Sequence, residues 1–399
     1  MRTGDLEEIR LRGKHNATAE YRFELLGRLD DENDRVRYTE EYLSSIIAEF
    51  QDIKLGVFSR SPRSYVETLL GWAYPDIEWD IIIAYEDVTK TKPYGEGVRR
   101  AMDDLDIDAL NSVVLVGDSD ADVRSAYNGG VISILDKGAW PYKYERQHWN
   151  ALSLVPDVII HKPSELIAVL ADYSRHLPDL ESALASEGSY NSVRFDKTNL
   201  FIPSSIGGDK TAYPVHSLGR HFSGYECLSE REKWHDLTHS IHDNKDSKVF
   251  PVAWVKSIRS FIRHNYPILP FGGNLIVTVI PPRPGRDHRL MYLLNQLSLE
   301  IDASKYKGRI QFIPDLLSYK EGVVSNSRGH LSRDDRFINI RDHLYVSRPE
   351  LIEDSSDVLV LDDVVTTGST LIYSKLYIEN AANCMVTCLA LAKNVSKVV

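Results

Sequence analysis

Short apolar runs alternate with longer amphipathic stretches along the chain. The runs are bounded by polar or turn-forming residues, as buried strands are, while the stretches between them repeat their apolar positions at helical spacing. The runs fall into two groups: Lys54–Phe58, Asp80–Tyr85, Ser112–Val116 and Val131–Leu135, then Asn274–Ile280, Arg309–Ile313, Asp357–Leu361 and Met385–Ala392. This alternation predicts an α/β protein with two doubly wound domains, each built on a parallel sheet.

The interval between the two groups predicts the domain boundary. Residues His176–Ser192 are polar and rich in small side chains, and they follow the helical stretch Ser164–Arg175. A chain of 399 residues is long for one domain, since domains typically run to about 100–200 residues. We therefore expect a first domain at 1–175, a linker at 176–196 and a second domain at 197–399.

Composition and charge narrow the class of protein. Hydrophobic residues at 43% and charged residues at 26% are ordinary for a soluble, folded chain. A net charge of −11 argues against a broad surface for nucleic acid or an anionic membrane. No apolar run approaches the roughly 20 residues that span a bilayer, and Met1–Arg12 is charged where a signal peptide is apolar. The sequence predicts a cytoplasmic protein with neither a nucleic-acid nor a membrane partner.

The strongest chemical signal is an apolar strand, beginning at Asp357, that ends in two adjacent carboxylates, Asp362 and Asp363. Parallel strands present their carboxyl ends to the crevice where ligands bind, and helix-start N–H groups favour a phosphate. Capping of the next helix would explain the hydroxyl side chains alone, but not two consecutive carboxylates, which are costly to bury without partners. The hydroxyl- and glycine-rich turn after the carboxylates consists of Thr366, Thr367, Gly368, Ser369 and Thr370.

This stretch resembles the motif of type I phosphoribosyltransferases that binds 5-phosphoribosyl-1-diphosphate (PRPP). Its surroundings, about residues 200–399, resemble the branch related to the competence protein ComF. The resemblance implies that Asp362 and Asp363 hold the ribose hydroxyls and that Thr366–Thr370 wrap the 5-phosphate. It also implies a small-molecule acceptor that no motif identifies, Mg²⁺ carried mainly by the diphosphate, and a homodimer by family precedent.

Two further segments fit this resemblance. Arg283, Arg286 and Arg289 follow the strand Asn274–Ile280, where such transferases keep a pyrophosphate loop, and the planar fork of arginine suits phosphate contacts. A solvated loop with chance arginines is the alternative. In Leu331–Arg341, the residues Arg336 and Asn339 resemble the mobile loop that covers the site in the ComF branch, whereas a charged surface helix would explain them equally well.

The first domain carries three ordered signals. Ser59 ends a strand before a helical stretch, Lys92 precedes a proline and a predicted helix, and Asp118 ends a buried strand with Asp122 close behind. A hydroxyl and helix-start N–H groups suit phosphate capture, and carboxylates at a strand end suit Mg²⁺. Taken singly, each signal also fits a helix cap, a solvated lysine or a turn.

In this order and spacing the signals resemble the haloacid dehalogenase (HAD) superfamily of phosphohydrolases, over about residues 40–173. The resemblance implies that Ser59 and Lys92 bind phosphate and that Asp118 and Asp122 lie near magnesium. That family attacks phosphate with the first aspartate of an Asp-x-Asp pair on its opening strand, and we find no such strand within residues 1–34. Either the chain begins downstream of that strand, or the domain has lost catalysis and kept its fold.

The two resemblances together predict a PRPP-dependent phosphoribosyltransferase fused to a HAD-like domain. A second hypothesis stays open at the level of sequence. In it, the C-terminal pocket binds PRPP or a nucleotide without turnover, and the protein acts as a sensor or regulator in a stress or defence system.

Overall fold

The computed structural model describes residues 36–185, 193–302, 309–324 and 331–395, which form two compact units. Unit 1 contains the described residues up to Tyr173 together with Tyr225–Trp234. Unit 2 contains those from Ser174 to Gly224 and from His235 onward. Both units are α/β with parallel sheets, so the predicted fold class is confirmed at that level, and each of the eight apolar runs overlaps a strand.

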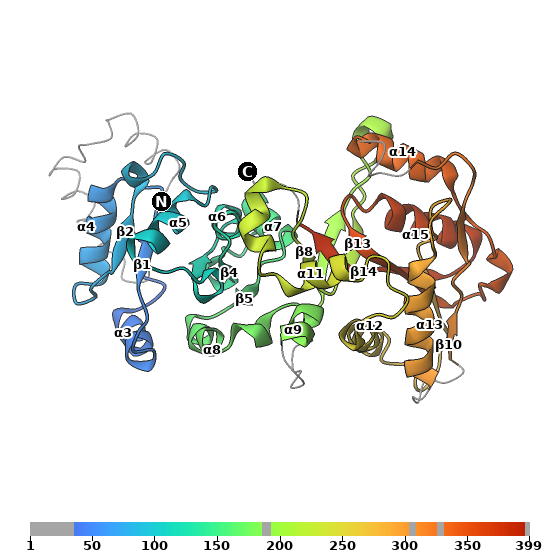
Figure 1. Ribbon diagram of the computed structural model, residues 1–399, viewed down its shortest axis with the longest axis horizontal. Helices are drawn as coiled ribbons and strands as arrows, with labels where there is room; N and C mark the ends of the chain where they lie inside the picture. Colours follow the sequence, from blue (N-terminus) through green and yellow to red (C-terminus); the bar gives the residue numbers. More distant parts are fainter. Residues whose placement is uncertain (1–35, 186–192, 303–308, 325–330, 396–399) are drawn as a thin grey trace. The chain divides into compact units, whose positions relative to one another are not determined.

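Unit 1 contains two separate parallel sheets with helices around them (Figure 1). Strand β1 (Gly56–Phe58) pairs with β2 (Ile81–Ile83), and β4 (Ile132–Asp136) lies between β3 (Val114–Gly117) and β5 (Val158–Ile160). The main helices of this unit are α3 (Glu40–Glu49), α4 (Arg63–Ala73), α5 (Glu96–Asp104), α6 (Asp120–Gly129), α7 (Arg146–Ser153) and α8 (Leu166–Ala171).

One edge of β1 and one edge of β3 have no strand partner among the described strands. Both strands contribute partly buried side chains, Phe58 and Leu115, to the cluster around Val98 and Ala126. Neither strand is fully buried, whereas β4 is buried along its whole length. The Asp-x-Asp strand expected from the HAD resemblance is not found among the described residues, and residues 1–34, where we sought it, lie outside them.

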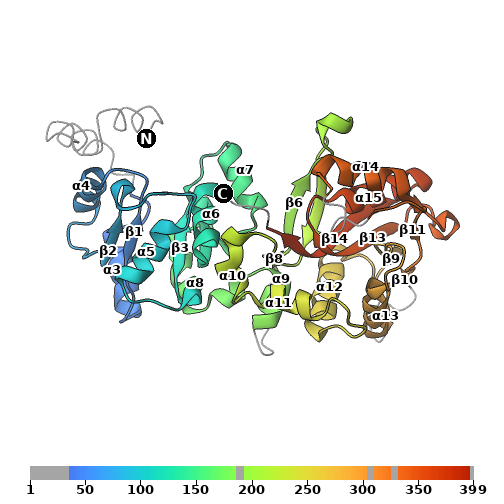
Figure 2. The ribbon, with the colours of Figure 1, turned by 45° about the horizontal axis from the view of Figure 1, so that its top comes forward.

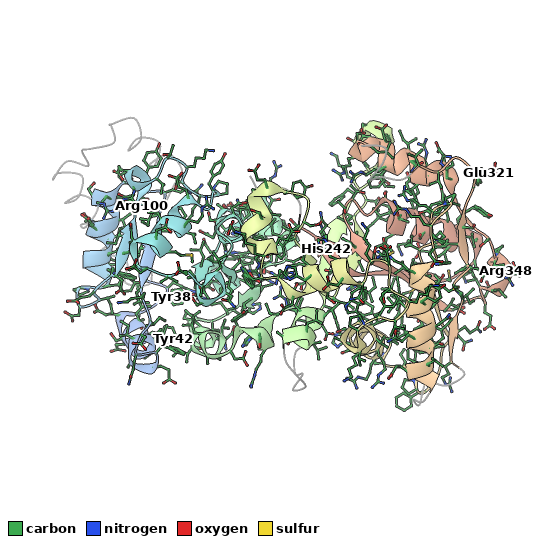
Figure 3. The ribbon with its side chains drawn as sticks, viewed as in Figure 1. Tyr38, Tyr42, Arg100, His242, Glu321 and Arg348 are labelled. Carbon is green, nitrogen blue, oxygen red and sulfur yellow. The ribbon has the colours of Figure 1, made fainter. Side chains whose placement is uncertain are left out.

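Polar contacts fix the start of α3 to the β4 side of unit 1. The guanidinium of Arg37 and the hydroxyl of Tyr38 both donate to the Asp136 carboxylate, the tyrosine at 2.9 Å. The hydroxyl of Tyr42 donates to the Pro163 carbonyl at 2.5 Å. Figure 3 labels Tyr38 and Tyr42, which lie at the lower left of the view.

The segment Tyr225–Trp234, with the short helix α10 (Ser229–Glu232), belongs to unit 1 although its neighbours in sequence belong to unit 2. The buried guanidinium of Arg231 pairs with the buried Asp157 carboxylate and donates to the Val131 carbonyl at 2.9 Å. The indole N–H of Trp234 donates to the Gly130 carbonyl at 2.8 Å. A buried ion pair is costly to break from one side, so this segment is fixed to unit 1.

The main sheet of unit 2 has the strand order β10-β9-β13-β14-β7-β6, and β8 also pairs with β14 (Figure 2). All pairs are parallel except β6 with β7. A separate antiparallel pair joins β11 (Leu317–Tyr319) to β12 (Leu344–Val346). The other strands are β6 (Asp196–Leu200), β7 (Tyr213–Ser217), β8 (Arg220–His221), β9 (Leu275–Val279), β10 (Ile310–Phe312), β13 (Asp357–Val365) and β14 (Met385–Asn394).

The helices of unit 2 include one within the linker expected at 176–196. Helix α9 buries Leu180, and the buried Glu181 accepts hydrogen bonds from the backbone N–H and the Nε of Arg220 at 2.6 and 2.9 Å. The structure differs from the expectation here because polar residues in this stretch are paired inside unit 2. Its helices are α9 (Asp179–Ala185), α11 (Asp236–Asp243), α12 (Val252–Asn265), α13 (Arg289–Asp302), α14 (Arg333–His343) and α15 (Ser369–Ala381).

Candidate functional site

Strand β13 delivers the paired carboxylates to the edge of the unit 2 sheet. It lies between β9 and β14, and its residues Val358–Leu361 are buried, so the apolar run forms the centre of the sheet. Asp362 and Asp363 follow near its carboxyl end. Gly368 is the N-cap residue that precedes α15, with a positive φ of 79°, and a Cβ there would lie 2.3 Å from Leu200 Cδ1. The turn therefore requires glycine both for its backbone conformation and for space.

A cavity of about 270 Å³ opens at this edge. It gathers the paired carboxylates, the turn and residues from three other segments of unit 2. The predicted residues that line it are Asp362, Asp363, Thr366, Thr367, Gly368, Ser369, Thr370, Arg283 and Arg336. Since α15 begins at this turn, its partial positive charge faces the region that holds the hydroxyls. The cavity can bind an anion at the turn and hydroxyl groups at the carboxylates.

Two arginines set the charge around the carboxylates. Arg289 forms an ion pair with Asp363 and also donates to the Lys245 carbonyl at 3.0 Å, although it does not line the cavity. Burial raises the pKa of Asp362 to about 7, against the opposing effect of Arg289 and Arg283. Burial also lowers the pKa of both arginines. Asp362 and Asp363 are thus electrostatically different although they are neighbours in sequence.

A hydrogen bond to the backbone of Val324 orients Arg283. Its guanidinium donates to the Val324 carbonyl, which also accepts from the side-chain amide of Asn339 at 3.0 Å. The Asn339 carbonyl oxygen accepts from the Val324 N–H, again at 3.0 Å. Asn339 is buried and does not line the cavity, so it acts on Arg283 only through Val324.

Arg286 and the expected mobile loop occupy other positions. Arg286 does not line the cavity, and its backbone N–H donates to the Arg283 carbonyl at 3.0 Å. Arg336 lines the cavity and donates from Nε to the Leu331 carbonyl at 3.1 Å. Residues 325–330, which precede this segment, lie outside the described residues.

Six lining residues were not among the predicted site residues: Ile280, Pro281, Tyr319, Val364, Val365 and Leu371. Ile280 ends the predicted strand Asn274–Ile280 and Pro281 follows it, while Val364, Val365 and Leu371 adjoin the predicted carboxylates and turn, so the positions of these five were available as a signal. Tyr319 comes from β11, a short strand that the apolar pattern did not reveal. Burial raises its pKa to about 12, and its side chain contacts that of Thr370 beside Arg283.

Lys92, Asp118 and Asp122 lie together at the carboxyl end of β3, and Ser59 directly follows β1. Lys92 pairs with Asp122 at 2.6 Å, and its ammonium lies 5.0 Å from the centre of the Phe58 ring, next to Ser59. Asp122 also accepts from the Ser119 hydroxyl at 2.6 Å. A Cβ on Gly117 would lie 2.3 Å from the Asp122 carboxyl carbon, which explains the glycine before Asp118.

The carboxylates of unit 1 fit a magnesium ion only in part. Burial alone would raise the pKa of Asp122, but Lys92 and Ser119 lower it below its ordinary value. Partial burial and the Asp122 carboxylate raise the pKa of Asp118, although that residue keeps an exposed surface. Within the described ranges, no group of three or more His, Cys, Asp or Glu side chains is placed to hold a metal. A cation at Asp118 would compete with Lys92 for Asp122.

Within the part of the chain that the structure covers, no helix is both long and apolar enough to cross a membrane.

The sequence of unit 1 matches a known class of protein. Residues 22–135 match the family of haloacid dehalogenase-like hydrolases. The N-terminal part of the chain therefore contains a haloacid dehalogenase-like hydrolase domain, and the resemblance expected for the first domain is confirmed at that level.

Individual relatives resemble part of the chain. The pyrophosphatases PpaX of Bacillus cereus (strain ATCC 10987 / NRS 248) and Bacillus thuringiensis (strain Al Hakam) are each 28% identical to this chain over 125 residues. These residues are 31% of this chain and 55% of either relative, so the chain spans about half the length of the curated relatives it matches. A haloacid dehalogenase-like hydrolase from Bacteroides fragilis is 29% identical, with a TM-score of 0.24, over 27% of this chain and 50% of that chain.

Proposed function

We propose that unit 2 is a phosphoribosyltransferase that binds PRPP with Mg²⁺ and transfers its phosphoribosyl group to a small-molecule acceptor. One observation carries the proposal. The paired carboxylates, the hydroxyl-rich turn and two arginines share a single cavity at the carboxyl edge of a parallel sheet. PRPP needs this combination, because it has an anion at each end of a sugar whose hydroxyls need acceptors.

Each group of the cavity has a distinct part in binding. Thr366–Thr370 and the start of α15 hold the 5-phosphate, and Asp362 accepts hydrogen bonds from the ribose hydroxyls. Arg283 and Arg336 line the same cavity, where they bind the diphosphate and stabilise the charge that develops on it as it leaves. Asp363 exchanges its ion pair with Arg289 for the sugar, which frees Arg289 for the diphosphate. The protein positions the ribose and stabilises charge, and Mg²⁺ neutralises the diphosphate.

The HAD-like domain of unit 1 binds a phosphate compound at Ser59 and Lys92 in this proposal. Lys92 pairs with Asp122 at 2.6 Å, and its ammonium lies 5.0 Å from the centre of the ring of Phe58, the residue before Ser59. The diphosphate released by phosphoribosyl transfer is one such compound, and two relatives of unit 1 are named pyrophosphatases. Hydrolysis by the chemistry of the family needs a nucleophilic aspartate on a strand that the described residues do not contain.

A second candidate is a sensor that binds PRPP without turnover. The ion pair between Arg289 and Asp363 favours it, because one of the two acids is already neutralised.

The test of the site is calorimetric titration of the full chain with PRPP and Mg²⁺, comparing the wild type with the double variant Asp362→Asn, Asp363→Asn. We expect the double variant to lose binding at least a hundredfold, since it removes two charged acceptors from the ribose hydroxyls while keeping their volume. A matched control is Asp357→Asn, at the opposite end of the same strand, which should bind as the wild type does.

The outcomes separate the two candidates. Binding with release of pyrophosphate in the presence of a panel of purine and pyrimidine bases supports the transferase. Binding without pyrophosphate release favours the sensor. Unchanged PRPP affinity in the double variant contradicts both.

A further inference from the structure

We infer that unit 1 binds a phosphate ester that carries a planar aromatic ring, such as a nucleoside monophosphate, and that the ring stacks on side chains beside Asp118. The surface consists of Trp140, Tyr144, His148 and Trp149, and we call it the aromatic platform. The inference deepens the proposed phosphate binding by Ser59 and Lys92 and rests on it. It assigns the second half of the ligand, which the phosphate residues leave open.

The aromatic platform is anchored at the end of β3. The indole N–H of Trp140 donates to the Asp118 carbonyl at 2.6 Å. Asp118 directly follows the last residue of β3, and its carboxyl interacts electrostatically with Lys92 and with His148. The platform and the phosphate residues therefore border the same small region of unit 1.

The rings form a connected cluster that is held rigidly. The centre of the Trp140 ring lies 5.0 Å from that of Tyr144 and 4.7 Å from that of His148. The Tyr144 ring lies 5.5 Å from that of Trp149. His148 is buried, and its Nδ1 accepts from the Glu145 N–H at 2.8 Å, which fixes the start of α7. Rings held in this way lose little side-chain entropy when a ligand binds to them.

The platform is exposed where a core cluster would be covered. Trp149 keeps 55% of its surface exposed, and the adjacent Tyr142 is fully exposed. Trp140 and Tyr144 are half-buried. Large aromatic side chains contribute most to stability when buried, so open ones in a single short segment indicate a binding surface.

Positive charge lies beside the rings. The Lys137 ammonium is 5.6 Å from the centre of the Tyr144 ring and 6.0 Å from that of Trp140. Lys137 thus brings a cation to the platform, and Lys92 brings another to the Asp122 carboxylate. A nucleoside monophosphate complements this arrangement, with its phosphate at the cations and its base on the rings. Base–aromatic stacking contributes about 1–3 kcal/mol per base, so the platform should favour such esters by roughly tenfold or more.

The test compares AMP, ribose 5-phosphate and pyrophosphate by calorimetric titration of the full chain. All titrations use the Asp362→Asn, Asp363→Asn background, which removes the unit 2 acceptors for ribose hydroxyls, and comparison with unit 1 variants of that background separates any remaining phosphate binding at Thr366–Thr370. We expect AMP to bind at least tenfold more tightly than ribose 5-phosphate. In Trp140→Leu the ratio should fall to about one, whereas Trp140→Phe, which keeps a ring and loses only the N–H donor, should preserve most of it.

A merely structural role of Trp140 would move the affinities for AMP and ribose 5-phosphate together and leave their ratio unchanged, and that result overturns the inference. Equal affinities in the parent protein overturn it too. Tyr142→Ala is the matched control, because this exposed ring of the same segment has no ring contact with the platform among the described residues. Lys92→Ala should weaken all three ligands. If it does not, the proposed phosphate site is wrong, and the ratio of the AMP and ribose 5-phosphate affinities still tests the aromatic platform.

Discussion

Asp362 and Asp363 are identical in type and adjacent in sequence, yet the fold gives them different surroundings. Asp363 is neutralised by Arg289, whereas Asp362 faces the cavity from a position where burial dominates. Asp363 is therefore available to a ligand only after its ion pair with Arg289 opens. Asp362 is available without such a step, but its raised pKa means that it holds a proton up to about pH 7.

The raised pKa of Asp362 predicts a pH-dependent stability. Its pKa is about 7 in the folded chain against 3.8 for an ordinary aspartate. Between these values the folded state holds a proton that the unfolded state has released, so this residue makes stability fall as pH rises from about 4 to about 7. Asp362→Asn removes the effect and should stabilise unit 2 at pH 8 by on the order of 2 kcal/mol.

The free energy of unfolding is measured with urea at pH 8 and at pH 4.5. Protection of the β13 amide protons against hydrogen exchange reports on the unfolding of unit 2. The difference between variant and wild type should be small at the lower pH, because the wild-type carboxyl is then protonated in the folded state. An equal difference at both pH values would show that Asp362 does not titrate as described.

At the residue scale, the sequence predicted the parts of the cavity that lie at or soon after strand ends. The carboxylates lie within the last four residues of β13, the turn follows that strand, Arg283 comes four residues after β9, and all of them line one cavity. Tyr319 was not predicted as a site residue, because no motif in the neighbouring sequence points to it. Its position depends on pairing with β12, a contact between residues far apart in the sequence.

At the scale of elements, the apolar runs predicted β1–β4, β9, β10, β13 and β14, because a parallel strand favours an uninterrupted apolar sequence, but they missed the parallel strands β5, β7 and β8. The antiparallel pair β11 and β12 and the edge strand β6 are short and only partly buried, so their sequences do not stand out from loops. Helix α9 was expected as linker because its polar residues have partners only in the folded unit.

The contact between α14 and the loop at Val324 yields a prediction for one element acting on another. Asn339→Ala removes both hydrogen bonds to Val324 and frees the carbonyl that orients Arg283. We expect PRPP affinity to fall about tenfold, which corresponds to about 1.4 kcal/mol. Asn339→Asp keeps the acceptor for the Val324 N–H, so its loss should be smaller.

Calorimetric titration with PRPP and Mg²⁺ provides the measurement. Asn295→Ala, an exposed asparagine on α13, is the control and should bind normally. If Asn339→Ala binds within twofold of the wild type, Arg283 is oriented without Val324 and the assigned role of Asn339 is wrong.

At the scale of the whole molecule, the chain does not divide at a single point. It leaves unit 1 after Tyr173, returns to it for Tyr225–Trp234 and then completes unit 2. The ion pair that fixes the returning segment joins Arg231 to Asp157, which are 74 residues apart. No local pattern encodes such a contact, so the sequence predicted two α/β units but not the return of the chain.

The central claim concerns the carboxyl edge of the unit 2 sheet, and a crystal structure of the full chain with PRPP and Mg²⁺ tests it most directly. We expect the 5-phosphate to lie against the backbone N–H groups of the Thr366–Thr370 turn and the ribose hydroxyls to donate hydrogen bonds to Asp362. Clear density for PRPP at another place, with this cavity holding only solvent, would contradict it.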